Sequence, residues 1–197
     1  MRIIVALMMV VPFFAGACAA GGMGGMGGCG MGGHEGHGTA SQASHAQEVK
    51  GVRPAPDPGF DAARTRRVLD AYDSIVVALA GDKTSGVAEA AALIVKDAPN
   101  DAIKEAAGSL SVADKKADIA GVRERFKALS ASVVLYAAGN HESLEAAIER
   151  DKAPMPRKAY CPMVETAWLQ HGEKITNPFY GSSMLRCGEF QNLAEAK

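Results

Sequence analysis

The chain has 197 residues, with 21 Lys and Arg, 22 Asp and Glu, and a formal net charge of −1. This length fits one ordinary domain with tails and argues against two large domains. The charges form no basic stripe of the kind that nucleic acid binding requires, so we expect no nucleic acid partner.

The N-terminal residues predict export from the cytoplasm. Arg2 supplies a short positive region, and residues 3–14 form an apolar stretch that is too short to span a bilayer. Small residues at 15–17 then precede Cys18. We therefore expect residues 1–17 to be a signal peptide and the mature protein to work in the bacterial periplasm or outer envelope.

Two processing routes fit the residues around Cys18. The run AGAC resembles a bacterial lipobox, in which the cysteine is diacylated and becomes the new N-terminus. Alternatively, an ordinary signal peptidase cuts after Ala17 or Ala19, because both sites read A-x-A. We favour lipidation of Cys18, which predicts contact with the membrane through a lipid anchor.

Residues 18–58 are rich in glycine at first and then in polar residues and proline. Such a composition buries too little apolar surface to offset the entropy of ordering, which predicts a flexible tether. Its thioethers, thiol and imidazoles suit Cu(I) or Ag(I), or Cu(II) through the histidines. These secondary candidate ligands are Met23, Met26, Cys29, Met31, His34, His37 and His45. The alternative is a spacer with incidental methionines.

Residues 59–150 show a helical period. One apolar stripe before Gly81 follows the 3.6-residue repeat and comprises Val68, Leu69, Tyr72, Ile75, Val76 and Leu79. Further helices are expected over 85–98 and 101–110. The pattern at Ser111 and Asp114 predicts a capping box for a long helix that ends at Gly139-Asn140. The buried stripe expected for this helix is Val122, Phe126, Leu129, Val133 and Tyr136. A weaker helical segment is expected over 142–150. The predicted fold class is all-α, a small antiparallel bundle.

Residues 151–197 differ from the helices in their prolines, glycines and aromatic residues. We expect them to form an irregular clasp, with one short helix over 165–169, packed on the bundle as part of one domain. Sulfur occurs at both ends of this segment. Cys161 and Met163 lie at its start, and Met184 and Cys187 lie near its end.

Two ligands on each of two approaching segments is a common way to build a four-coordinate metal site. Mixed thiolate and thioether ligands select soft Cu(I) over zinc. Cys161 and Cys187 are therefore candidate thiolate ligands for Cu(I) or Ag(I), completed by Met163 and Met184. Trp168 is a candidate to flank the metal by a cation–π contact.

A Cys161–Cys187 disulfide is the alternative at this site, because exported proteins often oxidise their cysteines. Closing a loop of about 25 residues contributes roughly 3 kcal/mol in the chain-entropy model. Met163 and Met184 are then core residues. A reversible pair, oxidised without metal and reduced when loaded, is compatible with both interpretations.

The run from Tyr160 to Phe190 resembles the signature of a domain family of unassigned function. The shared features are CPM, WL, NP followed by two aromatic residues and glycine, and ML-x-CG. They comprise Cys161, Pro162, Met163, Trp168, Leu169, Asn177, Pro178, Phe179, Tyr180, Gly181, Met184, Leu185, Cys187 and Gly188. That family occurs in periplasmic proteins and lipoproteins, and fused to adaptor subunits of copper and silver efflux pumps. The resemblance implies a helical bundle, copper or silver, and an efflux adaptor as partner.

The sequence favours a protein without enzymatic activity that sequesters Cu(I) or Ag(I) in the envelope or delivers it to an efflux adaptor. The chain has none of G-x-S-x-G, H-E-x-x-H or C-x-x-C-H, and no phosphate-binding loop leading into a helix. The alternative function is a structural or interaction module closed by the Cys161–Cys187 disulfide.

Overall fold

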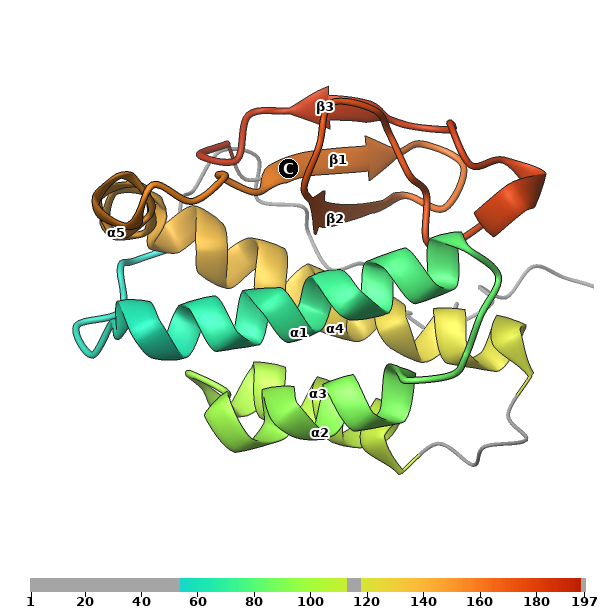
Figure 1. Ribbon diagram of the computed structural model, residues 1–197, viewed down its shortest axis with the longest axis horizontal. Helices are drawn as coiled ribbons and strands as arrows, with labels where there is room; N and C mark the ends of the chain where they lie inside the picture. The colour runs from blue at the N-terminus through green and yellow to red at the C-terminus, as the bar shows by residue number, and fades with distance from the viewer. Residues whose placement is uncertain (1–53, 113–117, 196–197) are drawn as a thin grey trace, which may run out of the picture. The chain divides into compact units, whose positions relative to one another are not determined.

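A computed structural model gives the structure of residues 54–112 and 118–195, which all lie in one compact unit, Ala46–Lys197. Its elements form three layers (Figure 1). Helices α1 (Ala62–Ala80) and α4 (Ile119–Gly139) form the middle layer, between a small sheet and the pair α2 (Val87–Asp97) and α3 (Asp101–Ser111). Helix α5 (His141–Asp151) crosses one end.

Helix α1 has the stripe that its sequence predicts. The Asp61 side chain accepts a hydrogen bond from the Arg64 N–H and caps the first turn. Gly81 follows the last turn and donates its N–H to helix carbonyls. All six predicted stripe residues are buried. Helical periodicity was therefore enough to place this element.

Alanine allows α2 and α3 to pack closely on the middle layer. Ala91 and Ala107 are fully buried, beside Ile94, Ile103 and Leu110. Asn100 begins α3, because its side chain accepts a hydrogen bond from the Ile103 N–H. Small side chains allow the helix axes to approach closely, so this core has few large side chains but is closely packed.

The predicted start of α4 is wrong. Ser111 is the last residue of α3, and its hydroxyl donates back to the Gly108 carbonyl. The cap of α4 is Asp118, which accepts from the Gly121 N–H. The predicted cap thus lies at the end of α3 and not at the start of α4. Asp114 lies outside the described residues. The predicted buried stripe of α4 is correct at Val122, Phe126, Leu129 and Val133, whereas Tyr136 is partly exposed.

The all-α prediction is also wrong, because the clasp contains a sheet. Strands β1 (Arg157–Cys161), β2 (Thr166–Gln170) and β3 (Glu189–Gln191) pair antiparallel in the order β2-β1-β3. A single 3-10 turn, η1 (Gly181–Ser183), precedes β3. The short helix expected over 165–169 is instead β2. The fold is a mixed α and β fold.

The sheet meets the helices through the edge of β2. The Tyr72 hydroxyl accepts a hydrogen bond from the Leu169 N–H at 3.3 Å, and the Ser130 hydroxyl donates to the Ala167 carbonyl at 2.8 Å. Tyr72 and Ser130 also bond each other at 2.6 Å. Burial raises the pKa of Tyr72 far above its ordinary value, and the hydrogen bonds with Ser130 and Leu169 offset only part of this rise. The strand edge is thereby closed by side chains of α1 and α4.

Strand alternation gives the sheet two different faces. Lys158 and Tyr160 share one face, and Ala159, Cys161 and Trp168 lie on the other. The second face is the more apolar one and is continuous with the core. The ring centres of Trp168 and Phe179 are 5.8 Å apart in an edge-to-face contact. Phe179 also packs, with its ring tilted, against Phe126 of α4, with the ring centres 5.6 Å apart. Aromatic contacts thus link the cysteine-bearing face to the helices.

Candidate metal site

Cys161 and Cys187 lie side by side although they are far apart in sequence. Cys161 is the last residue of β1, and Cys187 lies two residues before β3. Their sulfur atoms are 3.1 Å apart, and both cysteines are free. The pairing of β1 with β3 brings the two ends of the segment together. The antiparallel register is therefore what assembles this site.

Gly188 turns Cys187 toward Cys161. Tyr160 pairs with Glu189, so a regular ladder would place Gly188, and not Cys187, opposite Cys161. Gly188 has φ +137°, a conformation that favours glycine. A Cβ there would lie 2.9 Å from both the Trp168 ring and the Tyr160 carbonyl oxygen. Only glycine allows the chain to turn at this point, and with that turn the second sulfur reaches the first.

The turn after β1 surrounds the Cys161 sulfur with hydrogen-bond donors. The backbone N–H groups of Met163 and Val164 donate to this sulfur. Glu165, with φ +51°, ends the turn before β2 begins. Donors directed at a sulfur stabilise its ionised form, which is the form that binds metals.

Asn177 connects the two cysteine segments. Its side chain is fully buried; its Nδ2 donates to the Cys187 carbonyl oxygen at 2.8 Å and also to the Cys161 sulfur. Its Oδ1 accepts from the N–H groups of Phe179 and Tyr180 at 2.8 and 3.2 Å. One side chain therefore fixes the loop over Trp168 and the backbone beside both sulfurs. The sequence identified Asn177 as part of the family signature and did not predict its contact with the cysteines.

The two thiols have opposite pKa shifts. Burial opposes ionisation of Cys161, but hydrogen bonds from the Cys187 thiol and from the Met163 N–H, among others, hold the pKa of Cys161 below its ordinary value. The hydrogen bond to Cys161, followed by burial, raises the pKa of Cys187. Cys161 is thus the sulfur that ionises first, and Cys187 is the donor in the pair.

The predicted thioether ligands are exposed. Met163 is 64% exposed and Met184 is 36% exposed. Each is tied to the site by its backbone: the Met163 N–H donates to the Cys161 sulfur, and the Met184 carbonyl accepts from the Cys187 N–H at 2.9 Å. The disulfide interpretation expected both methionines to be core residues, and neither is. Ligation by their sulfurs stays a prediction.

Trp168 lies against the site from inside the protein. It is fully buried, and its indole N–H donates to Gln170 at 3.0 Å. The edge of its ring faces Gly188, next to Cys187. Arg157 lies 3.5 Å from the centre of the Phe190 ring on the same face of the sheet. The role predicted for Trp168 beside a metal stays a prediction.

The donor set fits a soft ion better than a hard one. In residues 54–112 and 118–195, no three side chains among His, Cys, Asp and Glu converge to hold a metal. Among the described residues, the charged ligands available at the pair are the two thiolates. Two metal–sulfur bonds of ~2.3 Å place the sulfurs about 3.7 Å apart at a tetrahedral angle and about 4.6 Å apart when collinear. From 3.1 Å, the pair needs to open by about 0.6 Å for a tetrahedral ion and by about 1.5 Å for a two-coordinate one.

Several candidates lie outside the described residues. They are Cys18, Met23, Met26, Cys29, Met31, His34, His37 and His45. Lipidation of Cys18 and metal capture by the others stay predictions. In the part of the chain that the structure describes, no helix has the length and hydropathy to cross a membrane.

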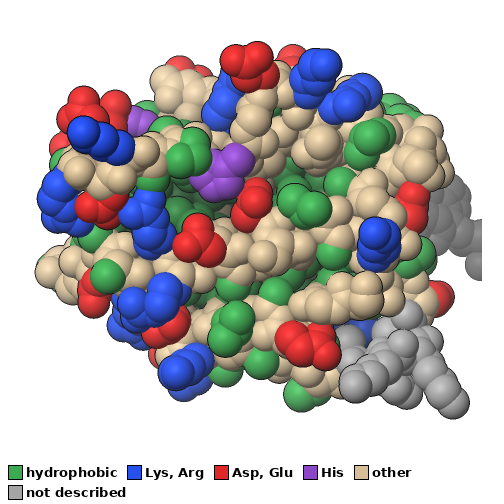
Figure 2. Space-filling view, viewed as in Figure 1, with side chains coloured by type: hydrophobic (Ala, Val, Ile, Leu, Met, Phe, Trp, Pro, Cys, Tyr) green, Lys and Arg blue, Asp and Glu red, His purple; other side chains and the backbone are tan. Residues whose placement is uncertain are grey.

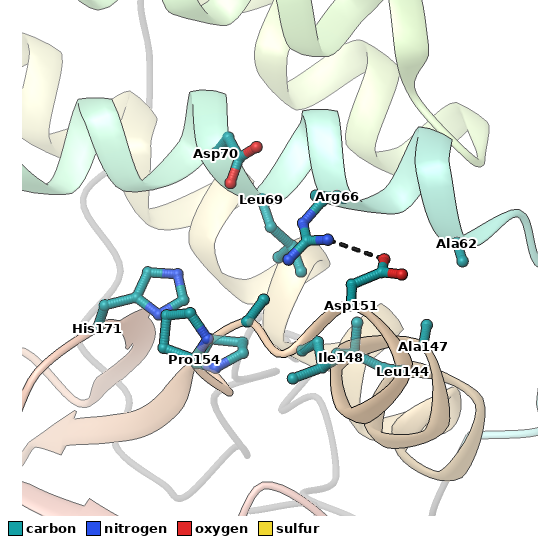
Figure 3. Close-up of a pocket in the computed structure, with 12 residues that line it drawn as sticks. Ala62, Arg66, Leu69, Asp70, Leu144, Ala147, Ile148, Asp151, Pro154 and His171 are labelled. Carbon is teal, nitrogen blue, oxygen red and sulfur yellow. Dashed lines mark hydrogen bonds and ion pairs between the residues drawn. The ribbon is translucent and has the colours of Figure 1, made fainter.

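A pocket lies away from the cysteines, between α1, α5 and the segment that follows α5. Figure 2 shows a depression with hydrophobic side chains on this face and a histidine beside it, among charges of both signs. Leu69, Leu144 and Ile148 are among its apolar lining residues, and its volume is about 70 Å³. His171 and the Arg66–Asp151 ion pair lie around it (Figure 3). This pocket fits a group of only a few atoms and contains no sulfur ligand.

Comparison with known proteins gives no relative for this chain: no family model, curated protein or solved structure matches it. The resemblance of residues 160–190 to the efflux-associated domain family therefore stays a prediction.

Proposed function

We propose that this is an exported, lipid-anchored envelope protein without enzymatic activity that binds Cu(I) or Ag(I) at Cys161 and Cys187. The observation that carries the proposal is the approach of the two thiols to 3.1 Å, with backbone N–H donors aimed at one of them. Thiolates are preferred ligands of soft monovalent ions. The exposed thioethers of Met163 and Met184 supplement the site from its solvent side.

The proposed role is sequestration of the ion or its delivery to an efflux adaptor. The sulfur and imidazole side chains between Met23 and His45 capture ions, and the cysteine pair holds them more tightly. Joining the two on one chain makes transfer between them intramolecular, at a raised effective concentration. The adaptor as partner rests on the family resemblance of residues 160–190.

A competition titration with a Cu(I) chelator under reducing conditions tests the binding site. The Cys161→Ser/Cys187→Ser double variant is expected to lose about three orders of magnitude in affinity, or about 4 kcal/mol. The matched Met163→Leu/Met184→Leu variant is expected to lose far less, since it keeps both thiolates. Full affinity in the cysteine variant would assign copper binding to other residues.

The proposed anchor has its own test. Expression in a bacterium fed a labelled fatty acid is expected to label the protein, and Cys18→Ser is expected to abolish the label. Recovery of the Cys18→Ser variant in the soluble fraction of the envelope would support anchoring at Cys18. An unlabelled wild-type protein found in the soluble periplasm would favour ordinary signal cleavage.

An interaction module closed by a Cys161–Cys187 disulfide is the second candidate. The same 3.1 Å separation favours it, since a disulfide requires the sulfurs to approach by only about another 1 Å. It predicts no Cu(I) binding tighter than micromolar by the reduced protein. The chelator titration on wild-type protein therefore separates the two functions.

A further inference from the structure

The two sulfurs of the site differ in access to solvent. Cys161 is 0% exposed, behind the turn that follows β1 and the buried side chain of Asn177. Cys187 is partly exposed and belongs to the surface turn whose N–H and carbonyl groups join Cys187 to Met184. A molecule arriving from solvent therefore meets Cys187 first, and Cys161 lies directly behind it at 3.1 Å.

We propose that this pair is an ordered thiol–disulfide exchange site, in which Cys187 attacks a disulfide from solvent and Cys161 then resolves the mixed disulfide. The oxidant is a low-molecular-weight or protein disulfide of the envelope. The exchange chemistry stands on the arrangement of the two thiols alone. Its consequence, that oxidation expels the soft ion and reduction restores the site, rests on the proposed metal-binding function.

The two steps balance without another reactant. Cys187 passes its thiol proton to the Cys161 sulfur 3.1 Å away, and the Cys187 thiolate attacks one sulfur of the incoming disulfide, forms a mixed disulfide and releases the first thiolate. The released thiolate takes up the proton from Cys161, which restores the Cys161 thiolate. The Cys161 thiolate then attacks the Cys187 sulfur, forms the Cys161–Cys187 disulfide, and releases the second thiolate. Two cysteine thiols are oxidised, and one external disulfide is reduced to two thiols.

The surrounding structure favours the second step. The donors around Cys161 fix its sulfur beside Cys187, and Asn177 holds the Cys187 backbone in the same place. Ring closure then needs a sulfur movement of about 1 Å, to the bond length of a disulfide. Strand pairing has already supplied the approach of two segments 26 residues apart.

Treatment with glutathione disulfide tests the order of attack, on full-length protein in which Cys18→Ser and Cys29→Ser leave only this pair. Adding Cys161→Ser is expected to give a protein that accumulates one glutathione adduct at Cys187, detected by mass spectrometry. Adding Cys187→Ser is expected to slow adduct formation at Cys161 by at least tenfold. The protein with both cysteines is expected to lose two thiols and carry no adduct.

Equal adduct rates in the two single variants, or a pair that stays reduced, would overturn the proposal. Circular dichroism of both variants and adduct formation in urea show whether access, and not misfolding, sets the rates. If either variant fails to fold, alkylation of the intact pair followed by peptide mapping gives the same answer. Cys187 is expected to react first; earlier alkylation of Cys161 contradicts the order.

Ion loading separates this inference from the proposed function. One equivalent of Ag(I) is expected to block oxidation of the reduced pair. If exchange proceeds at the same rate with Ag(I), the exchange proposal is supported and the metal site is refuted. If Ag(I) binds tightly but both thiols are inert toward disulfides, the metal site is supported and the exchange proposal is refuted.

Discussion

The helical layers and the sheet segment of this protein are stabilised in different ways. Helices α1 to α4 bury aliphatic and alanine side chains along regular stripes, and their hydrogen bonds are mostly local. The segment 157–195 has short strands, and its loops depend on buried polar side chains such as Asn177 and Gln170. Single substitutions are therefore expected to weaken the helices gradually but to disorganise the sheet segment and its thiol pair.

The two regions also divide the chemistry. The described helices provide a platform with α1 and α4 facing β2, whereas both described cysteines lie in the sheet segment. The contacts between the regions include the aromatic cluster, the two hydroxyls that bond β2, and the hydrogen bonds of Asp82 with Ser182 and of Arg123 with Pro178. These contacts decide whether the regions unfold together.

The largest effect is expected for Phe126→Ala. Phe126 is fully buried and contacts Tyr72 at 5.4 Å and Phe179 at 5.6 Å, so it joins both regions. Its loss is expected to cost about 3–5 kcal/mol of unfolding free energy. Urea unfolding followed by far-UV circular dichroism and by fluorescence of the single tryptophan measures both regions. Coincident transitions support one cooperative unit, whereas separate midpoints show independent regions.

Asn177→Ala is expected to act mainly on the sheet segment. It removes hydrogen bonds to two N–H groups, the Cys187 carbonyl and the Cys161 sulfur. We expect a loss of about 2–3 kcal/mol of stability and a Cu(I) affinity lower by roughly tenfold to a hundredfold. The exposed Asn192→Ala is the control. Unchanged copper affinity in a folded Asn177→Ala protein would refute the positioning role.

Glycine substitutions compare the regions directly. Gly188→Ala places a Cβ 2.9 Å from two neighbours at φ +137°, and is expected to cost about 1–3 kcal/mol and to separate the thiols. Gly108→Ala in α3 meets nothing within 4 Å and is expected to add about 0.5–1 kcal/mol. Thermal unfolding and the rate of disulfide formation measure the two effects. Equal stability changes would show that Gly188 has no conformational role.

The smallest effect is expected in how stability depends on acidic pH. Ser182 hydrogen bonds and Arg123 lower the pKa of Asp82 from 3.8 to about 2, and thereby link the α1–α2 connection to η1. A carboxyl with a lowered folded pKa stabilises the protein above its unfolded pKa and loses that contribution as pH falls toward 2. Asp82→Asn is therefore expected to unfold with a weaker pH dependence between about pH 4 and 2 than wild type. An unchanged profile would contradict the link.

The sequence predicted the helices better than the sheet, for physical reasons. An amphipathic helix repeats its period over many residues, so α1 and the stripe of α4 were visible. Strands of three to five residues, whose burial does not alternate strictly, give no such signal. The predicted cap at Ser111 failed because a second capping residue, Asp118, lies seven positions later.

The site was partly predictable. Cysteine spacing suggested that Cys161 and Cys187 approach each other, and their sulfurs do. The roles of Gly188 and Asn177 depend on strand register and on a loop that folds over Trp168, which local pattern does not encode. A glycine directly after a cysteine and an asparagine before proline were the available signals. Exposure of Met163 and Met184 was not predictable from their types.

The most direct test of the account is copper X-ray absorption spectroscopy on the reduced full-length protein loaded with one equivalent of Cu(I). Binding by Cys161 and Cys187 predicts an all-sulfur shell of two to four ligands, which in the Cys161→Ser/Cys187→Ser variant is lost or replaced by the ligands between Met23 and His45. A shell of nitrogen or oxygen ligands, or the same sulfur shell in that variant, would contradict a metal site at this thiol pair.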